Sequence, residues 1–169
     1  PTRRSSDLLR LVSRLIKGGL GSKIYMVTLG GFDTHGNQPL THQGLLTQLS
    51  DSIKVFYDDL NYDGFDSKVL TMTFSEFGRR VNENGSEGTD HGSSAPIMLF
   101  GPALRGSGFV GDHPSLTNLD RRGNMQHSID FRSIYQTILS EWLCGDSNYI
   151  NKAMLGEEYD VLGDRKSVV

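Results

Sequence analysis

Two apolar runs in this chain have the composition of β-strands, and each of them ends in a polar turn. Residues 23–29 are a nearly continuous run of β-branched, aromatic and aliphatic side chains that stops at Gly30, and residues 68–74 repeat the pattern. Such runs are typical of strands that are covered on both faces. Residues 40–60 lie between them and carry apolar side chains at helical spacing, which predicts one long amphipathic helix. The order strand, helix, strand favours an α/β fold.

The remaining apolar segments extend this alternating order. Residues 96–100 predict a third strand, and a helical pattern from Leu8 to Ile16 precedes the first one. Asp130 stands where it can cap a final helix, whose apolar face continues to Trp142. We therefore expect an incomplete three-layer α/β sandwich in which helices cover a mainly parallel sheet.

The polar turns carry acidic and imidazole side chains. Asp33 and His35 follow the first predicted strand, and Asp90 and His91 stand together in a second glycine-lined turn. Carboxylate oxygen and imidazole nitrogen are the usual ligands of zinc and similar divalent ions. We therefore predict a metal site built from these four side chains, with helix capping or turn formation as the alternative role of Asp33. The hypothesis requires the imidazoles of His35 and His91 to lie within roughly 12 Å of each other.

A third polar cluster runs from Ser75 to Arg80 after the second predicted strand. Its candidate catalytic residues are Glu76, as a metal ligand or proton-transfer group, and Arg79, whose planar fork suits the oxygens of a phosphate or sulfate ester. The alternative is an internal ion pair between these two side chains. Ser75 lacks the Gly-x-Ser-x-Gly setting of a serine nucleophile. Residues 82–94 are polar and rich in glycine, which predicts a loop.

Composition argues against two kinds of partner. The 17 basic and 20 acidic residues are interspersed and sum to a formal charge of -3, so we expect no basic surface for nucleic acid. No apolar stretch approaches the roughly 20 residues needed to cross a bilayer, so we expect no membrane span. The single cysteine, Cys144, cannot form an internal disulfide, and its place after Trp142 and Leu143 predicts a buried structural thiol.

The two ends of the chain differ in character from the rest. Residues 1–8 and 164–169 resemble translated sequencing adapter, and we expect them to be non-native. The expected natural segment is then residues 9–163, a length that suits one domain. No low-complexity linker divides it.

Four runs in the order LGGFDTHGNQ, SEFGRR, GTDHG and DFRSIYQTILSEWL resemble the carboxyl-terminal part of the bacterial domain-of-unknown-function family 1501. The resemblance implies a relation to the alkaline phosphatase and sulfatase superfamily. It also implies that residues 9–163 are the carboxyl-terminal part of one alkaline-phosphatase-like domain. Proteins of this kind are usually exported through a twin-arginine signal, so the implied location is periplasmic or secreted.

The resemblance also assigns residues to the metal site. Asp90 and His91 resemble the adjacent Asp-His ligands of the superfamily, and Asp33 with His35 takes the place of its earlier Asp/His ligands. One residue separates Asp33 from His35, whereas phosphatases commonly have three. A further histidine ligand near the carboxyl end would be His113 or His127.

The implied function is that of a metal-dependent hydrolase acting on an anionic small-molecule or glycan ester of phosphate or sulfate. We expect zinc, with manganese, iron or calcium as alternatives. The hydroxyl nucleophile of such enzymes would lie upstream, so this chain alone is predicted to be inactive against simple aryl esters. The alternative is a non-catalytic exported module in which the same turns bind a structural ion and the surface binds glycan or protein. Histidine at both clusters favours the hydrolase over a calcium-binding module.

Overall fold

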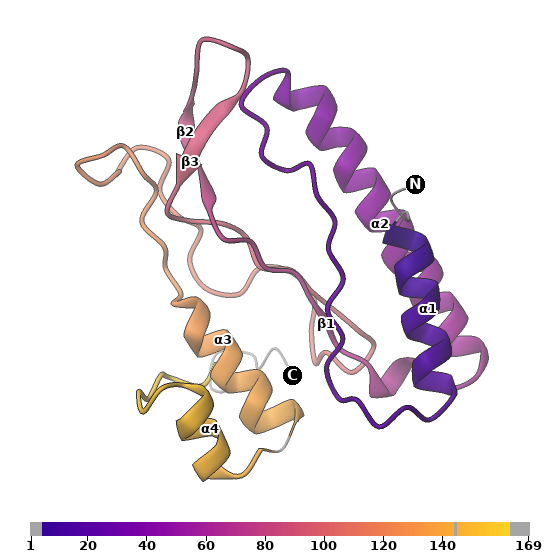
Figure 1. Ribbon diagram of the computed structural model, residues 1–169. Coiled ribbons are helices and arrows are strands. Elements are labelled where there is room, and N and C mark those ends of the chain that lie inside the picture. Colours follow the sequence, from indigo (N-terminus) through magenta and orange to yellow (C-terminus); the bar gives the residue numbers. More distant parts are fainter. Residues whose placement is uncertain (1–4, 144, 163–169) are drawn as a thin grey trace.

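The computed structural model describes residues 5–143 and 145–162 (Figure 1). Cys144, and with it the predicted buried thiol, lies outside the described residues, as do residues 1–4 and 163–169. The elements follow in the order α1 (Ser5–Lys17), α2 (Gln38–Tyr62), the 3₁₀ turn η1 (Asp66–Lys68), β1 (Thr71–Met72), β2 (Gly78–Glu83), β3 (Thr89–Gly92), β4 (Leu99–Phe100), α3 (Phe131–Thr137), the π-helical turn η2 (Ile138–Trp142) and α4 (Ser147–Ala153).

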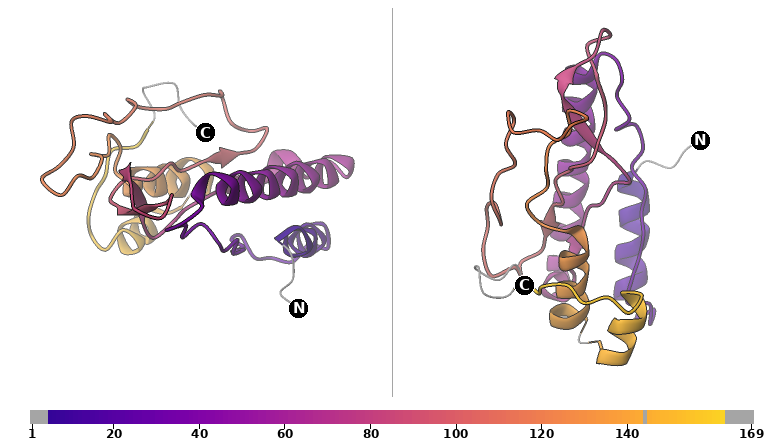
Figure 2. Two further views of the ribbon diagram at one scale, coloured as in Figure 1. Left: turned by 90° about the horizontal axis from the view of Figure 1, so that it is seen from above. Right: turned by 90° about the vertical axis from the view of Figure 1, so that its left-hand side faces the viewer.

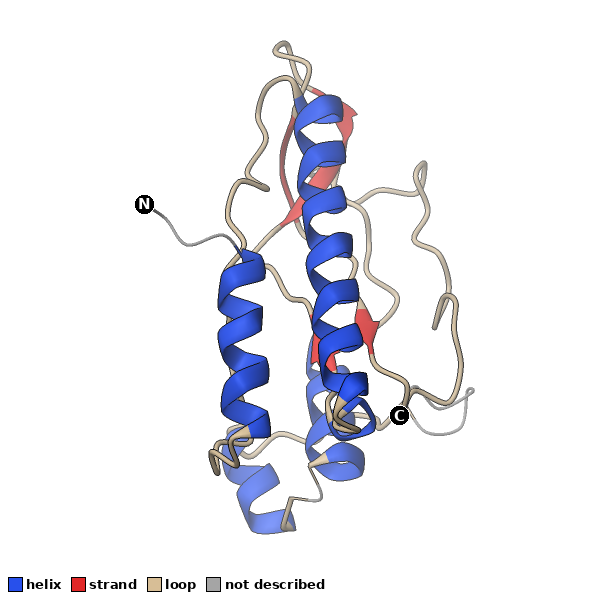
Figure 3. Ribbon diagram, turned by 90° about the vertical axis from the view of Figure 1, so that its right-hand side faces the viewer, coloured by secondary structure: helices blue, strands red, loops and turns tan. Residues whose placement is uncertain are grey.

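The helices α1 and α2 lie side by side and run in the same direction (Figures 1 and 3). Two consecutive helices can run in the same direction because the extended segment that joins them leads the chain from the end of α1 back beyond the level of its start, to the point where α2 begins (Figure 1). The helix predicted at 40–60 is confirmed as α2, and its apolar face is buried in the second half of the helix, at Ile53, Phe56 and Leu60. From α1, the ammonium group of Lys17 binds the carboxylates of Asp59 and Asp63 at 2.9 and 2.7 Å.

Seen from above, α1 and α2 lie on one side of the molecule, and α3 and α4 lie on the other (Figure 2). The side chain of Tyr57 joins α2 to the β1–β4 pair, because its hydroxyl donates to the carbonyl oxygen of Phe100 at 2.6 Å. Burial raises the pKa of this phenol. None of the helices in the described part is long and apolar enough to cross a membrane.

The predicted three-layer sandwich with a mainly parallel sheet is wrong. The described strands form two antiparallel pairs of two strands each, β1 with β4 and β2 with β3. Parallel neighbours need a crossover connection, which is usually a helix. The connection from β1 to β4 contains the β2–β3 hairpin and no helix in the described residues, and the chain returns in the opposite direction.

The strand predicted at residues 23–29 is also absent. The segment is extended, but no backbone hydrogen bond joins it to another described residue. Its apolar side chains are covered on one side only, since Ile24 and Met26 are 72% and 76% exposed while Tyr25, Val27 and Leu29 are half-buried. The expectation of coverage on both faces is therefore incorrect for this segment.

The predicted cap of the final helix is confirmed, because the Asp130 carboxylate accepts a hydrogen bond from the backbone N–H of Arg132 at the start of α3. The same carboxylate pairs with the Arg132 guanidinium at 2.6 and 2.9 Å. Hydrogen bonding by the Arg132 side chain is the main reason that the pKa of Asp130 is lowered from 3.8 to about 2.

We expect Asp130→Ala to lower the free energy of unfolding near neutral pH by about 1 kcal/mol, the usual contribution of an N-cap. A carboxyl group whose pKa is lower in the folded state than in the unfolded state stabilises the folded protein at pH values above its unfolded-state pKa. This stabilisation is lost as the pH falls through its folded-state pKa. The difference from the wild type should therefore disappear between about pH 4 and about pH 2. Urea unfolding of the wild type and of Asp130→Ala across this pH range measures the difference in their free energies of unfolding. A difference that does not change with pH would contradict a stabilising role of the ionised Asp130 carboxylate. Asp130→Asn, which keeps an acceptor without the charge, is the control.

Candidate metal centre

The strands β2 and β3 form a hairpin in which Arg79 is directly opposite His91. Directly opposite residues of an antiparallel pair share a face, so these two side chains lie on one face of the hairpin. Successive residues of a strand alternate between faces, which directs Asp90 away from His91. The interpretation of residues 82–94 as a loop is wrong for β3 and for the end of β2.

The turn that precedes α2 packs against the tip of this hairpin (Figure 1). The backbone N–H of Asn37 donates to Ser86 O at 3.1 Å, and that of Gln38 donates to Glu87 O at 2.8 Å. These bonds bring the first polar turn of the sequence, which carries Asp33 and His35, against the hairpin that carries His91. Residues about 50 positions apart in the chain thus meet at one place.

Asn84 links the turn and the hairpin through its side-chain amide. Its Nδ2 donates to His35 O at 3.0 Å and to Asp90 Oδ1 at 3.4 Å, and its Oδ1 accepts from the backbone N–H groups of Ser86 and Gly88. Asn84 is not among the predicted site residues. The available signal was the dipeptide Asn84-Gly85, which is a strong marker of a hairpin turn.

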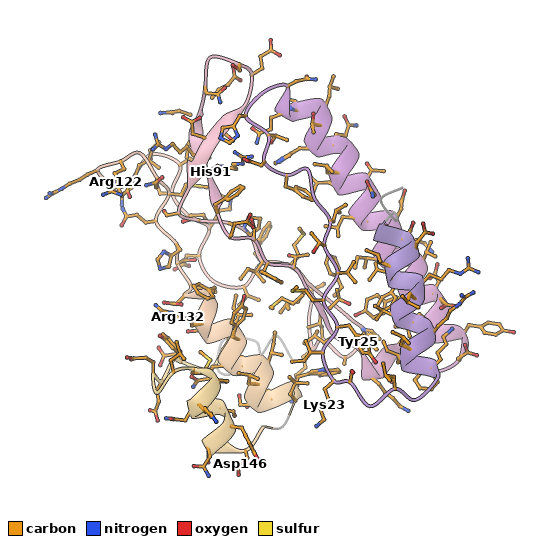
Figure 4. The ribbon with its side chains drawn as sticks, in the orientation of Figure 1. Lys23, Tyr25, His91, Arg122, Arg132 and Asp146 are labelled. Carbon is orange, nitrogen blue, oxygen red and sulfur yellow. The ribbon has the colours of Figure 1, made fainter. Side chains whose placement is uncertain are left out.

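Three of the predicted ligands come together. Asp33 Oδ1 lies 2.8 Å from His91 Nε2 and 3.0 Å from His35 Nδ1, and the two imidazole ring centres are 4.9 Å apart. One donor atom from each of the three side chains lies within 4.8 Å of the others. All three residues are exposed, and Figure 4 shows His91 on the hairpin, on the side that faces the start of α2.

The Asp33 carboxyl is held in its ionised form. Its pKa is lowered mainly by the hydrogen bond from His91, and the charges of His35, His91 and Arg79 act in the same direction. A carboxyl group must be deprotonated to bind a metal ion. Asp33 is therefore in the protonation state that a ligand requires at neutral pH.

The ring of His91 is fixed by a neighbouring aromatic side chain. Phe77 stacks on the imidazole with ring centres 3.8 Å apart and planes within 8° of parallel. The guanidinium carbon of Arg79 lies 5.2 Å from the centre of the Phe77 ring. Stacking holds the imidazole in one plane, so Nε2 keeps its direction toward Asp33.

The residues present fit a divalent metal ion. The four donors of a tetrahedral zinc site lie about 3.3 Å from one another, because each is about 2.0–2.1 Å from the metal. The three donor atoms of this cluster already lie within 4.8 Å of one another, so small side-chain rotations suffice. Two imidazoles and a carboxylate suit zinc, manganese or iron better than calcium, which takes oxygen ligands.

The other predicted site residues lie outside this cluster. Asp90 is bound by Asn84, Glu76 is exposed, and no ion pair joins Glu76 to Arg79 in the described part of the chain. His113 Nδ1 contacts the carbonyl oxygen of Pro114 at 2.9 Å, and neither it nor His127 belongs to the cluster. The described geometry therefore brings together Asp33, His35 and His91, with Arg79 bonded to Asp33 at 3.0 Å. Asp90, Glu76, His113 and His127 stay outside this group.

Comparison with curated proteins and with solved structures gave no significant match. One protein-family model does match, over residues 11–168, and its description is "Protein of unknown function (DUF1501)". The match spans nearly the whole chain and includes every residue of the cluster. The chain therefore belongs to the DUF1501 family of proteins of unknown function.

Proposed function

We propose that Asp33, His35 and His91 bind one divalent cation, zinc in the first place, and that this chain supplies the metal centre of an exported hydrolase of phosphate or sulfate esters. The observation that carries the proposal is the convergence of three donor atoms within 4.8 Å on an exposed surface. Structural zinc sites usually have four protein ligands, whereas catalytic ones have three and keep one position open. A three-ligand exposed site therefore favours catalysis.

A divalent ion supplies Lewis-acid chemistry: it polarises an ester oxygen and makes a nucleophile more reactive. The residues of this chain would hold and orient that ion. Asp33 contributes a negative charge that is retained at neutral pH, and Phe77 fixes the plane of the His91 ring. The substrate class that we propose is an anionic small-molecule or glycan ester, whose charged oxygens an exposed cation attracts.

A structural ion in a non-catalytic module is the second candidate, and one observation favours it. Arg79, the expected partner of an anionic ester, donates instead to two backbone carbonyl groups and to Asp33. A site that only stabilises the packing of the hairpin against the turn would need no anion-binding group. The two candidates differ in whether the bound ion has a position open to an oxyanion.

Cobalt substitution tests both candidates, because the visible absorption of Co²⁺ reports its coordination. We expect elemental analysis to find one Zn²⁺ or Co²⁺ per chain, and we expect inorganic phosphate or sulfate to change the cobalt spectrum by occupying the open position. A protein that binds the metal with a spectrum insensitive to both anions would support the structural ion. Absence of metal binding would refute both candidates.

A further inference from the structure

The guanidinium group of Arg79 is engaged by three partners inside the candidate metal centre. Its Nη1 donates to Thr89 O at 2.8 Å, and its Nη2 donates to Phe32 O at 2.7 Å and to Asp33 Oδ1 at 3.0 Å. The Arg79 side chain is 16% exposed, whereas the side chain of Asp33 is 55% exposed. Arg79 is thus the covered member of an otherwise exposed group.

These contacts join the two segments that carry the metal ligands. Phe32 and Asp33 belong to the turn before α2, and Thr89 begins β3, two residues before His91. A guanidinium can make all three bonds at once because it is planar and carries several N–H donors in a fixed fork. A lysine ammonium is a single point charge on a flexible chain and cannot reproduce this geometry.

The same contacts leave Arg79 poorly placed to receive a substrate. Both of its terminal nitrogens already donate to protein oxygens, and its guanidinium carbon lies over the Phe77 ring at 5.2 Å. These three bonds do not use all five N–H donors of the guanidinium. The Arg79 side chain is only 16% exposed, however, so little of the group is open to an incoming phosphate or sulfate oxygen. The neighbouring Arg80 differs, since its one described hydrogen bond is from Nε to His91 O at 3.3 Å and its residue is exposed.

We infer that Arg79 is a positioning residue of the metal centre: it fixes the Asp33 carboxylate and holds the turn at residues 32–33 against β3, and it does not bind the anion of the substrate. The inference rests on the proposed metal-binding function. It assigns to Arg79 a different role from the substrate contact that its residue type suggests.

The test compares Arg79→Lys and Arg79→Gln with the matched control Arg80→Gln, which removes the same charge from the next residue of β2. Titration with Co²⁺ should show affinity lowered about 10- to 100-fold in both Arg79 variants, as for other residues that orient metal ligands. Arg80→Gln should change it by less than about fivefold, the size of an exposed charge interaction. Failure of lysine to rescue would show that the fork, and not the charge, is required.

A second measurement separates positioning from substrate binding. At saturating Co²⁺, the affinity of each variant for inorganic phosphate should stay within about fivefold of the wild type, because Arg79 does not touch the anion. A decrease of phosphate affinity beyond about 100-fold in both Arg79 variants, with Arg80→Gln unaffected, would overturn the inference. Circular dichroism of each variant verifies that the fold is kept.

The failure of this inference is distinguishable from that of the proposed function. If the wild type binds no Co²⁺, the proposed function fails; if the wild type binds it and the Arg79 variants bind it equally well, only the positioning role fails. Should the Arg79 variants not fold, NMR of the arginine guanidinium groups in the zinc-loaded wild type decides. Arg79 resonances that do not move on addition of phosphate support the inference, and resonances that shift overturn it.

Discussion

Asp33→Asn is expected to lower the affinity of this chain for Zn²⁺ or Co²⁺ by more than about 100-fold, the upper range for residues that only support a ligand. Asp33 Oδ1 is the atom on which His35, His91 and Arg79 converge. The substitution removes the only carboxylate of the cluster and leaves a neutral amide that binds zinc poorly. Isothermal titration calorimetry, together with elemental analysis after dialysis, measures the effect.

Asp90→Asn is the matched control, because it makes the same chemical change at an exposed aspartate of the adjoining strand. Asp90 accepts one hydrogen bond from Asn84 at 3.4 Å and does not belong to the cluster. We expect its metal affinity to fall by less than about fivefold. Equal losses in both variants would contradict the three-residue site and would restore Asp90 as a ligand.

The different roles of the two aspartates show where the sequence was informative about the site. The donor chemistry and the glycine-rich settings predict four ligands, Asp33, His35, Asp90 and His91, and the structure brings three of them together. The glycine-lined run around Asp90 and His91 predicts a turn, and in a turn two neighbouring side chains can converge on one ion. Residues 89–92 are a strand instead, and strand geometry separates neighbouring side chains onto opposite faces.

Local signals predicted the helices better than the sheet. The apolar spacing of α2 and the cap at Asp130 depend on residues within a few positions of one another, and both predictions are confirmed. Sheet pairing depends on which distant segments meet. An apolar run such as 23–29 does not specify its partner, and in this structure the run is extended but unpaired in the described residues.

The role of Arg79 could not be predicted from sequence for a related reason. An arginine after a strand suits both an anionic substrate and a set of protein carbonyl groups. The choice depends on the approach of Phe32 O and Thr89 O, which come from segments 47 and 10 residues away. Tertiary packing decides the chemistry that remains available to the side chain.

That packing depends on the absence of a side chain at Gly88. A Cβ atom at this position would lie 2.2 Å from the carbonyl carbon of His35 and 2.5 Å from the backbone nitrogen of Gly36. Both contacts are with backbone atoms, which cannot rotate away as the end of a side chain can. The turn that carries Asp33 and His35 can therefore approach the hairpin only if residue 88 is glycine.

Gly88→Ala is expected to lower the free energy of unfolding by about 2–3 kcal/mol, because the turn must separate from the hairpin to relieve overpacking. The melting temperature should fall by about 5–10 °C, and metal affinity should fall with it, since His35 and His91 are carried by the two parts that separate. Gly85→Ala, in the same hairpin, is the control: its Cβ would meet nothing within 4 Å. We expect it to change stability by less than about 0.5 kcal/mol. Differential scanning calorimetry and Co²⁺ titration of both variants measure these effects, and wild-type behaviour of Gly88→Ala would show that the turn does not pack here.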